Sequence, residues 1–307
     1  MKVTAQQVLS HLNTCGSPFQ LVRHCNEVHS KHKVYPTTVE VKYDGVFCAV
    51  VVGEGKHYCV SRTGKLFFNP INSIMYPQVP SEDGVWIGEL INKRCSLEVL
   101  SGLLSPNRVK PWTEEEADLM RSADIIFHDA LTLGEAHQGF ALATQSVRFK
   151  RLPWYVYTVD SKVVTSEEEL LKYAAEVIAK GGEGICIKNP AADYEAGHKG
   201  WRVMKIVRDL HIDLRCVAVK MGNKGKRYGQ IAKLQFKYNN KLFWADLGAG
   251  WTDDKRIALT IAWQKQTELD PLWKVFHVKA LQESSKGVLR LPKVMEMRID
   301  KDTEDTV

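Results

Sequence analysis

The spacing of apolar residues at the start of the chain is helical. Residues 5–12 (AQQVLSHL) and 19–32 (FQLVRHCNEVHSKH) place apolar side chains three and four positions apart. Thr4 and Ser17 precede these runs and are candidate N-caps. The sequence therefore predicts two scaffold helices before residue 33.

From Thr37 the pattern changes to short β-branched and aromatic runs separated by Gly, Pro and Asn. These runs predict strands at 37–45, 46–53, 57–64, 84–92, 124–131, 154–160 and 184–188. Residues 166–181 predict a helix that Ser166 caps and Gly181 ends, with acidic residues in its first turn. Strands mixed with helices in this way predict an antiparallel α+β domain.

After Lys205 the strand signals continue at 205–222, 229–240, 241–250, 274–284 and 289–300, with a helical pattern at 252–266. Several short strands in about a hundred residues favour a small β-barrel, with the oligonucleotide-binding (OB) fold as the leading candidate. We expect one domain over residues 1–207, a second over 208–307, and a frayed acidic tail at 302–307.

Composition narrows the class of protein only slightly. A length of 307 residues suits two domains, and a net charge of +6 fits a phosphate-bearing partner but also many other enzymes. The seven cysteines are scattered and never spaced as Cys-x-x-Cys, which indicates reduced thiols and not a disulfide framework or zinc site. No run approaches membrane-spanning length, so we expect a protein of the cytoplasm with no membrane partner.

One charged strand face stands out. In VEVKYDG the side-chain period of two places Glu40, Lys42 and Asp44 on the same face. Such a face can be a solvated surface with ordinary charge pairs. It can also carry a nucleophilic lysine, which requires a neutral amine, and a buried site holding other cations can lower the pKa of a lysine toward neutrality.

An ordered series of motifs follows this lysine. It consists of Ser61-Arg62-Thr63-Gly64, Gly88-Glu89-Leu90, residues 124–131 around Phe127, Glu183 to Lys188 (EGICIK), Trp201 with Lys205, and Arg298-Ile299-Asp300-Lys301. In order and spacing the series resembles the covalent nucleotidyltransferases, the superfamily of ATP-dependent DNA ligases, RNA ligases and mRNA capping enzymes. The stretches EVKYDGV, SGLLSPNRVKPWT, GGEGICIKNP and LRLPKVMEMR look most like the short two-domain DNA ligases of phages.

The resemblance implies an α+β fold in which an antiparallel-sheet nucleotidyltransferase (adenylation) domain precedes an OB-fold barrel. It also implies an ATP-dependent DNA ligase, with ATP and Mg²⁺ as cofactors and nicked double-stranded DNA as substrate. Lys42 would take AMP from ATP, pass it to a 5'-phosphate, and a 3'-hydroxyl would then displace it. The resemblance further implies a monomer that acts in the cytoplasm of a bacterial host, in DNA replication, repair or recombination.

The same resemblance assigns roles to individual residues. Lys42 is the nucleophile, Glu40 reads the adenine amino group, Phe127 stacks on the base, and Arg62 contacts the ribose or the phosphates. Lys188 and Lys205 offset the charge of the α-phosphate, and Glu89, Glu183 and Asp44 are the expected metal ligands. Arg298 and Lys301 close over ATP. Independently of the resemblance, the basic residues Lys224, Lys226 and Arg227 in the loop MGNKGKRYG can track the DNA backbone, although a basic turn on a barrel is also common with no ligand.

Two positions depart from the family pattern. Phe47 stands where the family commonly has arginine, and Val203 stands where it has the first of two lysines. Three alternatives therefore remain: a capping guanylyltransferase using GTP, an RNA ligase, and a non-catalytic nick-binding or single-strand-binding protein. Glu40 argues against GTP, because a carboxylate accepts from the adenine amino group but repels the carbonyl oxygen of guanine.

Overall fold

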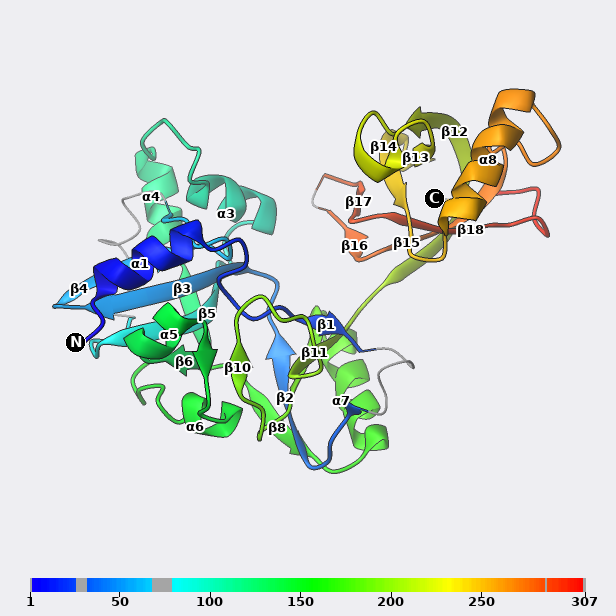
Figure 1. The fold of residues 1–307 in the computed structure, drawn as a ribbon. Helices are drawn as coiled ribbons and strands as arrows, with labels where there is room; N and C mark the ends of the chain where they lie inside the picture. The colour runs from blue at the N-terminus through cyan, green and yellow to red at the C-terminus, as the bar shows by residue number, and fades with distance from the viewer. Residues whose placement is uncertain (1, 26–31, 68–78, 285, 306–307) are drawn as a thin grey trace. The chain divides into compact units, whose positions relative to one another are not determined.

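The computed structural model describes residues 2–25, 32–67, 79–284 and 286–305, and the chain divides into two compact units, Met1–Val207 and Arg208–Val307 (Figure 1). Each unit has its own hydrophobic core. The first unit contains both helices and strands, as predicted, and the second contains a closed barrel. The predicted arrangement of an α+β domain followed by a small closed β-barrel is confirmed.

The first unit is built on two mainly antiparallel sheets. A four-stranded sheet has the order β4-β3-β5-β6, and a five-stranded sheet has the order β1-β11-β9-β2-β8. The strands of the first sheet are β3 (Val46–Gly53), β4 (Lys56–Val60), β5 (Gly84–Ile91) and β6 (Asp124–Leu131). Those of the second are β1 (Arg23–His24), β2 (Thr37–Lys42), β8 (Ser161–Val164), β9 (Gly184–Lys188) and β11 (Val203–Val207). The strands β7 (Phe140–Ala141) and β10 (Tyr194–Glu195) form a small separate pair.

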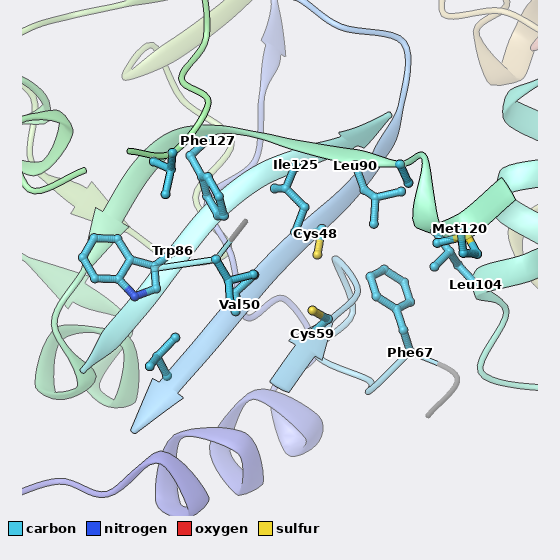
Figure 2. Packing of buried hydrophobic residues seen from close by; sticks show 14 of the residues in the cluster. Cys48, Val50, Cys59, Phe67, Trp86, Leu90, Leu104, Met120, Ile125 and Phe127 are labelled. Atoms are coloured by element: carbon cyan, nitrogen blue, oxygen red, sulfur yellow. The ribbon is translucent and has the colours of Figure 1, made fainter. Parts of the chain in front are cut away.

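Helices cover these sheets. They are α1 (Ala5–Thr14), α3 (Leu97–Leu104), α4 (Glu114–Arg121), α5 (Leu133–Gln138), α6 (Gln145–Phe149) and α7 (Glu167–Ala179). Two separate core clusters contain side chains of the four-stranded sheet: one includes Leu100, Leu104 and Met120 of α3 and α4, and the other includes residues of α1 and α5. Figure 2 shows the first cluster, in which Cys48, Trp86 and Phe127 pack among aliphatic side chains. The sheet therefore has one face in each core.

The N-terminal helix and α7 confirm two predictions. Thr4 forms a capping box with Gln7, and Ser166 accepts from the Glu169 amide, so both helices begin where the sequence indicates. The helix predicted over 19–32 is wrong for 19–25, where β1 pairs with β11; residues 26–31 lie outside the described residues. The pairing with β11 outweighs the helical spacing of this run.

One strand prediction also needs correction. Residues 154–160 form turns with a single bridge at Thr158, and the strand begins only at Ser161. Trp154 is 93% exposed, so this aromatic run does not have the half-buried side chains that its composition indicated.

The second unit is a five-stranded closed barrel with the order β12-β13-β14-β18-β15. Its elements are β12 (Leu210–Met221), β13 (Ile231–Tyr238), β14 (Lys241–Leu247), β15 (Val275–Ala280) and β18 (Lys293–Met297), with the helix α8 (Asp253–Lys265), the 3₁₀ turn η2 (Gly225–Arg227) and the short pair β16 (Gln282–Glu283) and β17 (Leu289–Arg290). Strand residues of alternating burial fill the interior with side chains such as Phe236 and Phe276.

The acidic tail is held against the barrel as far as residue 305, contrary to the expectation of a frayed end. The Asp305 amide donates to the Asp213 carbonyl at 2.8 Å, and Glu304 pairs with Arg215 at 2.7 Å. No helix among the described residues is long and apolar enough to cross a bilayer.

Candidate active site

A pocket in the first unit is lined by residues of both sheets. Lys42 and Glu40 reach it from β2, Glu89 from β5, and Lys188 from β9. Arg62, another predicted site residue, also lines the pocket. The structure therefore brings together five residues that the sequence pattern singled out from positions as far apart as 40 and 188.

Lys42 forms an ion pair with Glu183. The distance from Lys42 Nζ to Glu183 Oε2 is 2.6 Å, and the glutamate side chain is only 6% exposed. The pairing follows from the sheet, because β2 and β9 are antiparallel neighbours with Lys42 opposite Gly184. Glu183 immediately precedes β9 and so reaches the lysine across one strand spacing.

This pair changes the expected protonation of the lysine. Burial disfavours the charge, but the Glu183 carboxylate outweighs it and holds the pKa of Lys42 above its ordinary value. The hypothesis that the site lowers the pKa of this lysine is therefore wrong. Lys42 is an ammonium group here, and it must lose a proton before it can act as a nucleophile.

Glu89 lies in the same pocket and has a raised pKa. Burial raises the pKa of Glu89 to about 7, against the opposing effects of Lys42 and Arg62. Gly45 makes the close approach possible, since a Cβ at this position would lie 2.5 Å from the Leu90 carbonyl oxygen and 2.8 Å from Glu89 Cγ. This explains the glycine in the Lys-x-Asp-Gly motif: the turn after β2 passes directly against β5.

Glu40 and Lys188 form a second, deeper ion pair. Lys188 Nζ lies 2.8 Å from Glu40 Oε2, and the two side chains are 4% and 3% exposed. The same ammonium donates to the His128 carbonyl at 2.7 Å and lies 3.3 Å from His128 Nδ1. Glu40 Oε1 is buried and has no hydrogen-bond partner in the described part of the chain. A pocket carboxylate thus keeps one acceptor oxygen unused.

The expectation that Phe127 stacks on a base needs correction. Its ring is fully buried in the core cluster of Figure 2, and it is not among the pocket-lining residues. Successive side chains of a strand point to opposite faces, so its neighbours Ile126 and His128 line the pocket instead. Burial and the charge of Lys188 hold the pKa of His128 well below its ordinary value, so this imidazole is neutral.

Lys205 lies beside the pocket and is not part of its lining. It faces Cys186 across β11 and β9, and burial together with the charge of Lys42 lowers the pKa of Lys205. Val203, which replaces the first family lysine, lines the pocket opposite Lys188. Asp44 is exposed and does not line the pocket, so the structure does not support its expected role as a metal ligand.

The predicted residues of the barrel have partners within the barrel itself. Arg298 and Lys301 both donate to the buried Asp213 carboxylate, at 2.7 and 2.8 Å. Lys226 pairs with Asp253 at 2.8 Å and Arg227 pairs with the same carboxylate, while Lys224 precedes the turn η2. Asp253 therefore offsets part of the charge expected to contact DNA.

Sequence reasoning missed several residues around the pocket. Asp129 lines it and holds Arg148 through two bonds of 2.9 and 3.1 Å, and Arg148 is among the largest fully buried side chains. Tyr194 also lines the pocket and is buried. The strand period of two on β6 was a usable signal for His128, whereas nothing local marks Arg148 or Tyr194.

Comparison with known proteins relates this chain to DNA ligases in sequence and in fold. Residues 123–206 match the family model described as the ATP-dependent DNA ligase domain. A probable DNA ligase of Koribacter versatilis is 27% identical over 189 residues, which cover 56% of this chain and 31% of the relative. The chain thus spans less than a third of the length of that relative.

Two solved structures share the fold. One, titled Pmar-Lig_PreS3, has a TM-score of 0.73 at 20% identity and is matched over 92% of this chain and 68% of its own. The other comes from a structure-function study of DNA binding by Lig E DNA ligases, with a TM-score of 0.68 at 16% identity over 91% and 98% of the two chains.

The chain therefore shares its fold with these DNA ligase structures, and its residues 123–206 match the ATP-dependent DNA ligase domain in sequence. The resemblance to these ligases, seen first in the order of its motifs, is confirmed.

Proposed function

We propose that this protein is an ATP-dependent DNA ligase that seals 3'-hydroxyl/5'-phosphate nicks in duplex DNA through AMP carried on Lys42. The observation that carries the proposal is the 2.6 Å contact of Glu183 with Lys42, a lysine that lines the same pocket as Glu40. Glu40 Oε1 has no hydrogen-bond partner among the described residues. The family match over 123–206 and the shared fold support it.

In the first step Lys42 Nζ forms a bond to the α-phosphorus of ATP, and the bond from that phosphorus to the pyrophosphate oxygen breaks. The lysine must lose a proton, and the Glu183 carboxylate at 2.6 Å is placed to accept it. Since the reaction is an in-line displacement at phosphorus, catalysis depends on positioning and on neutralising negative charge. Lys205 and Arg62 are the cations proposed to do this at the phosphates.

The adenine end of the pocket is proposed to lie at Glu40. Its free Oε1 can accept a hydrogen bond from the adenine amino group, whereas the carbonyl oxygen of guanine would face a carboxylate. Lys188 is already bound by Glu40 and His128, so we reassign it from the α-phosphate to this end, where its charge opposes the effect of burial on the pKa of Glu40. The neutral imidazole of His128 replaces Phe127 as the ring that the base would contact.

Glu89 and Glu183 fit a magnesium ion that arrives with ATP. Hard carboxylate oxygens suit Mg²⁺, which usually takes one or two of them together with phosphate oxygens and water. Within the described ranges no group of three or more His, Cys, Asp or Glu side chains could hold a metal by itself. The two glutamates would hold the ion, and bound Mg²⁺ would neutralise phosphate charge.

The remaining steps transfer AMP from Lys42 to the 5'-phosphate of a nick and then release AMP as the 3'-hydroxyl attacks that phosphate. Nicked duplex DNA is the proposed partner, the basic residues Lys224, Lys226 and Arg227 are proposed to contact its backbone, and Arg298 and Lys301 to close over ATP. Action as a monomer in the bacterial cytoplasm, for a phage and in DNA replication, repair or recombination, rests on the sequence resemblance alone.

The test is to incubate the protein and Mg²⁺ with α-labelled ATP or GTP, and then add nicked duplex. Label from ATP that stays on the denatured chain, is absent in Lys42→Ala and is discharged by the nicked duplex would support the proposal. Label from GTP would favour a capping enzyme, discharge only by nicked RNA would favour an RNA ligase, and binding of nicks without labelling would favour the non-catalytic alternative.

A further inference from the structure

Arg62 enters the pocket from a tight turn that fixes its backbone. The Gly64 amide donates to the Ser61 carbonyl at 2.9 Å, and the Ser61 amide donates to the Lys65 carbonyl at 2.8 Å. Gly64 has a φ of +76°, and a Cβ there would lie 2.0 Å from the Leu12 carbonyl oxygen. Only glycine fits this position, so the turn that presents Arg62 has little freedom.

The side chain of Arg62 lies over the ring of Phe47. Its Cζ is 4.6 Å from the ring centroid, within the range of a cation–π contact. Phe47 is 8% exposed and packs at 4.8 Å between ring centroids against Phe19, which is 2% exposed. All three residues line the pocket. A rigid pair of buried rings thus supports the guanidinium from one side.

The nitrogen atoms of this guanidinium have no hydrogen-bonding partner among the described residues. In the part of the chain that the structure describes, no hydrogen bond or ion pair joins Arg62 to another residue, whereas Lys42 is bound to Glu183 and Lys188 to Glu40. The charge of Arg62 nevertheless reaches into the site, since it acts to lower the pKa values of Glu89 and His128. An aromatic face leaves all the donors of an arginine available to an anion.

We propose that Phe47 is a positioning residue that holds Arg62, through its ring face, in the orientation that binds the phosphates of the nucleotide. This inference rests on the proposed function and adds to it a role for a position where the chain departs from the family pattern. The ring does not replace the missing arginine as a ligand; it orders the arginine that remains. A flexible Arg62 would lose side-chain entropy on binding that the stacked Arg62 has already lost.

The experiment is a double-mutant cycle with Phe47→Leu and Arg62→Ala. Phe47→Leu keeps an apolar side chain but removes the ring face, and Phe47→Tyr is the ring-preserving control. We expect Phe47→Leu to raise the KM for ATP in lysyl-AMP formation roughly two- to fivefold, the size of an exposed cation–π contact, with a smaller change in the rate at saturation. Phe47→Leu should have no further effect on KM when Arg62 is already alanine.

Additive effects of the two substitutions, or equal KM values for Phe47→Leu and Phe47→Tyr, would overturn the inference, because Phe47 would then contribute only packing. The melting temperature of each variant separates that structural contribution from binding. The same double-mutant cycle can be measured as ATP affinity by calorimetry in Lys42→Ala variants, in which no lysyl-AMP can form. A wild-type protein that binds ATP but forms no lysyl-AMP would contradict the proposed function while leaving this coupling measurable.

Discussion

Lys188 Nζ lies 2.8 Å from one carboxylate oxygen of Glu40, while the other oxygen is buried and has no hydrogen-bond partner in the part of the chain that the structure describes. Burying a charge is costly unless it is paired, so the lysine stabilises the ionised form of this glutamate. Burial raises the pKa of Glu40, and the charge of Lys188 opposes that shift. The pair provides a fixed acceptor for a base that carries an amino group.

Nucleotide selectivity should therefore depend on Glu40. Glu40→Gln replaces an acceptor-only group by an amide that can also donate to the carbonyl oxygen of guanine. We expect the preference for ATP over GTP in nucleotidyl transfer to Lys42, which gives lysyl-AMP or lysyl-GMP, to fall by about tenfold, equivalent to about 1.4 kcal/mol. The ratio of the two rates at low nucleotide concentration measures this effect, and an unchanged ratio would show that Glu40 does not read the base.

The rate of lysine adenylylation should rise with pH. Glu183 holds the pKa of Lys42 above its ordinary value, so the neutral amine becomes more abundant as pH increases, and Glu89 loses its proton near pH 7. Both groups change in the same direction between pH 6 and 9, and single-turnover labelling with ATP measures the result. Glu183→Gln removes the group that raises the pKa and should shift the profile to lower pH, even if the rate falls. A flat profile in the wild type would contradict this account.

We expect the buried carboxyl group of Glu89 to destabilise the folded protein at a pH where the group is ionised in the unfolded chain. A carboxyl group with a raised pKa binds its proton more tightly in the folded state, so folding stability falls as pH rises from about 4.5 to about 7. Glu89→Gln should raise the free energy of unfolding at pH 8 by on the order of 1–3 kcal/mol, while it impairs lysyl-AMP formation. Chemical denaturation at pH 5 and pH 8 checks the sign, since the gain should nearly vanish at pH 5. An equal gain at both values would show that the carboxyl proton is not the cause.

Substitutions of Phe127 and His128 should distinguish a residue that only packs in the core from one that contacts the nucleotide. Phe127→Leu removes part of a fully buried ring and should cost about 1–3 kcal/mol of stability without changing the KM for ATP. His128→Ala alters a pocket-lining ring and should raise the KM for ATP severalfold with a smaller loss of stability. Thermal melts and adenylylation kinetics on the same preparations distinguish the two. The reverse pattern would restore Phe127 as the residue that contacts the base.

The sequence predicted most strands and the position of Lys42 because the period of two and the caps are local signals. It could not show that Phe127 faces the core, because an aromatic residue in a strand fits either face until the register is known. The partners of Lys188 and Lys42 were also hidden, since they depend on β9 pairing with β2 across more than a hundred residues of chain. The order of the motifs identified the candidate site residues, whereas the strand pairing of the sheet determined which of their charged side chains form ion pairs.

The contacts of Phe47 could not be predicted from the sequence either. A departure from the family pattern indicated a lost contact, yet the structure shows Phe47 against Phe19 and beneath Arg62. The turn that carries Arg62 and the strand that carries Phe47 are both visible in the sequence, but their contact is a property of the packed fold.

The central claim is that AMP becomes bonded to the side chain of Lys42. The direct measurement is peptide mapping by mass spectrometry after incubation with ATP and Mg²⁺, before and after addition of nicked duplex DNA. We predict an AMP adduct on the peptide that contains Lys42, its disappearance with the nicked duplex, and the appearance of sealed strands. An adduct on a different lysine, or sealed strands from the Lys42→Ala protein, would contradict the account.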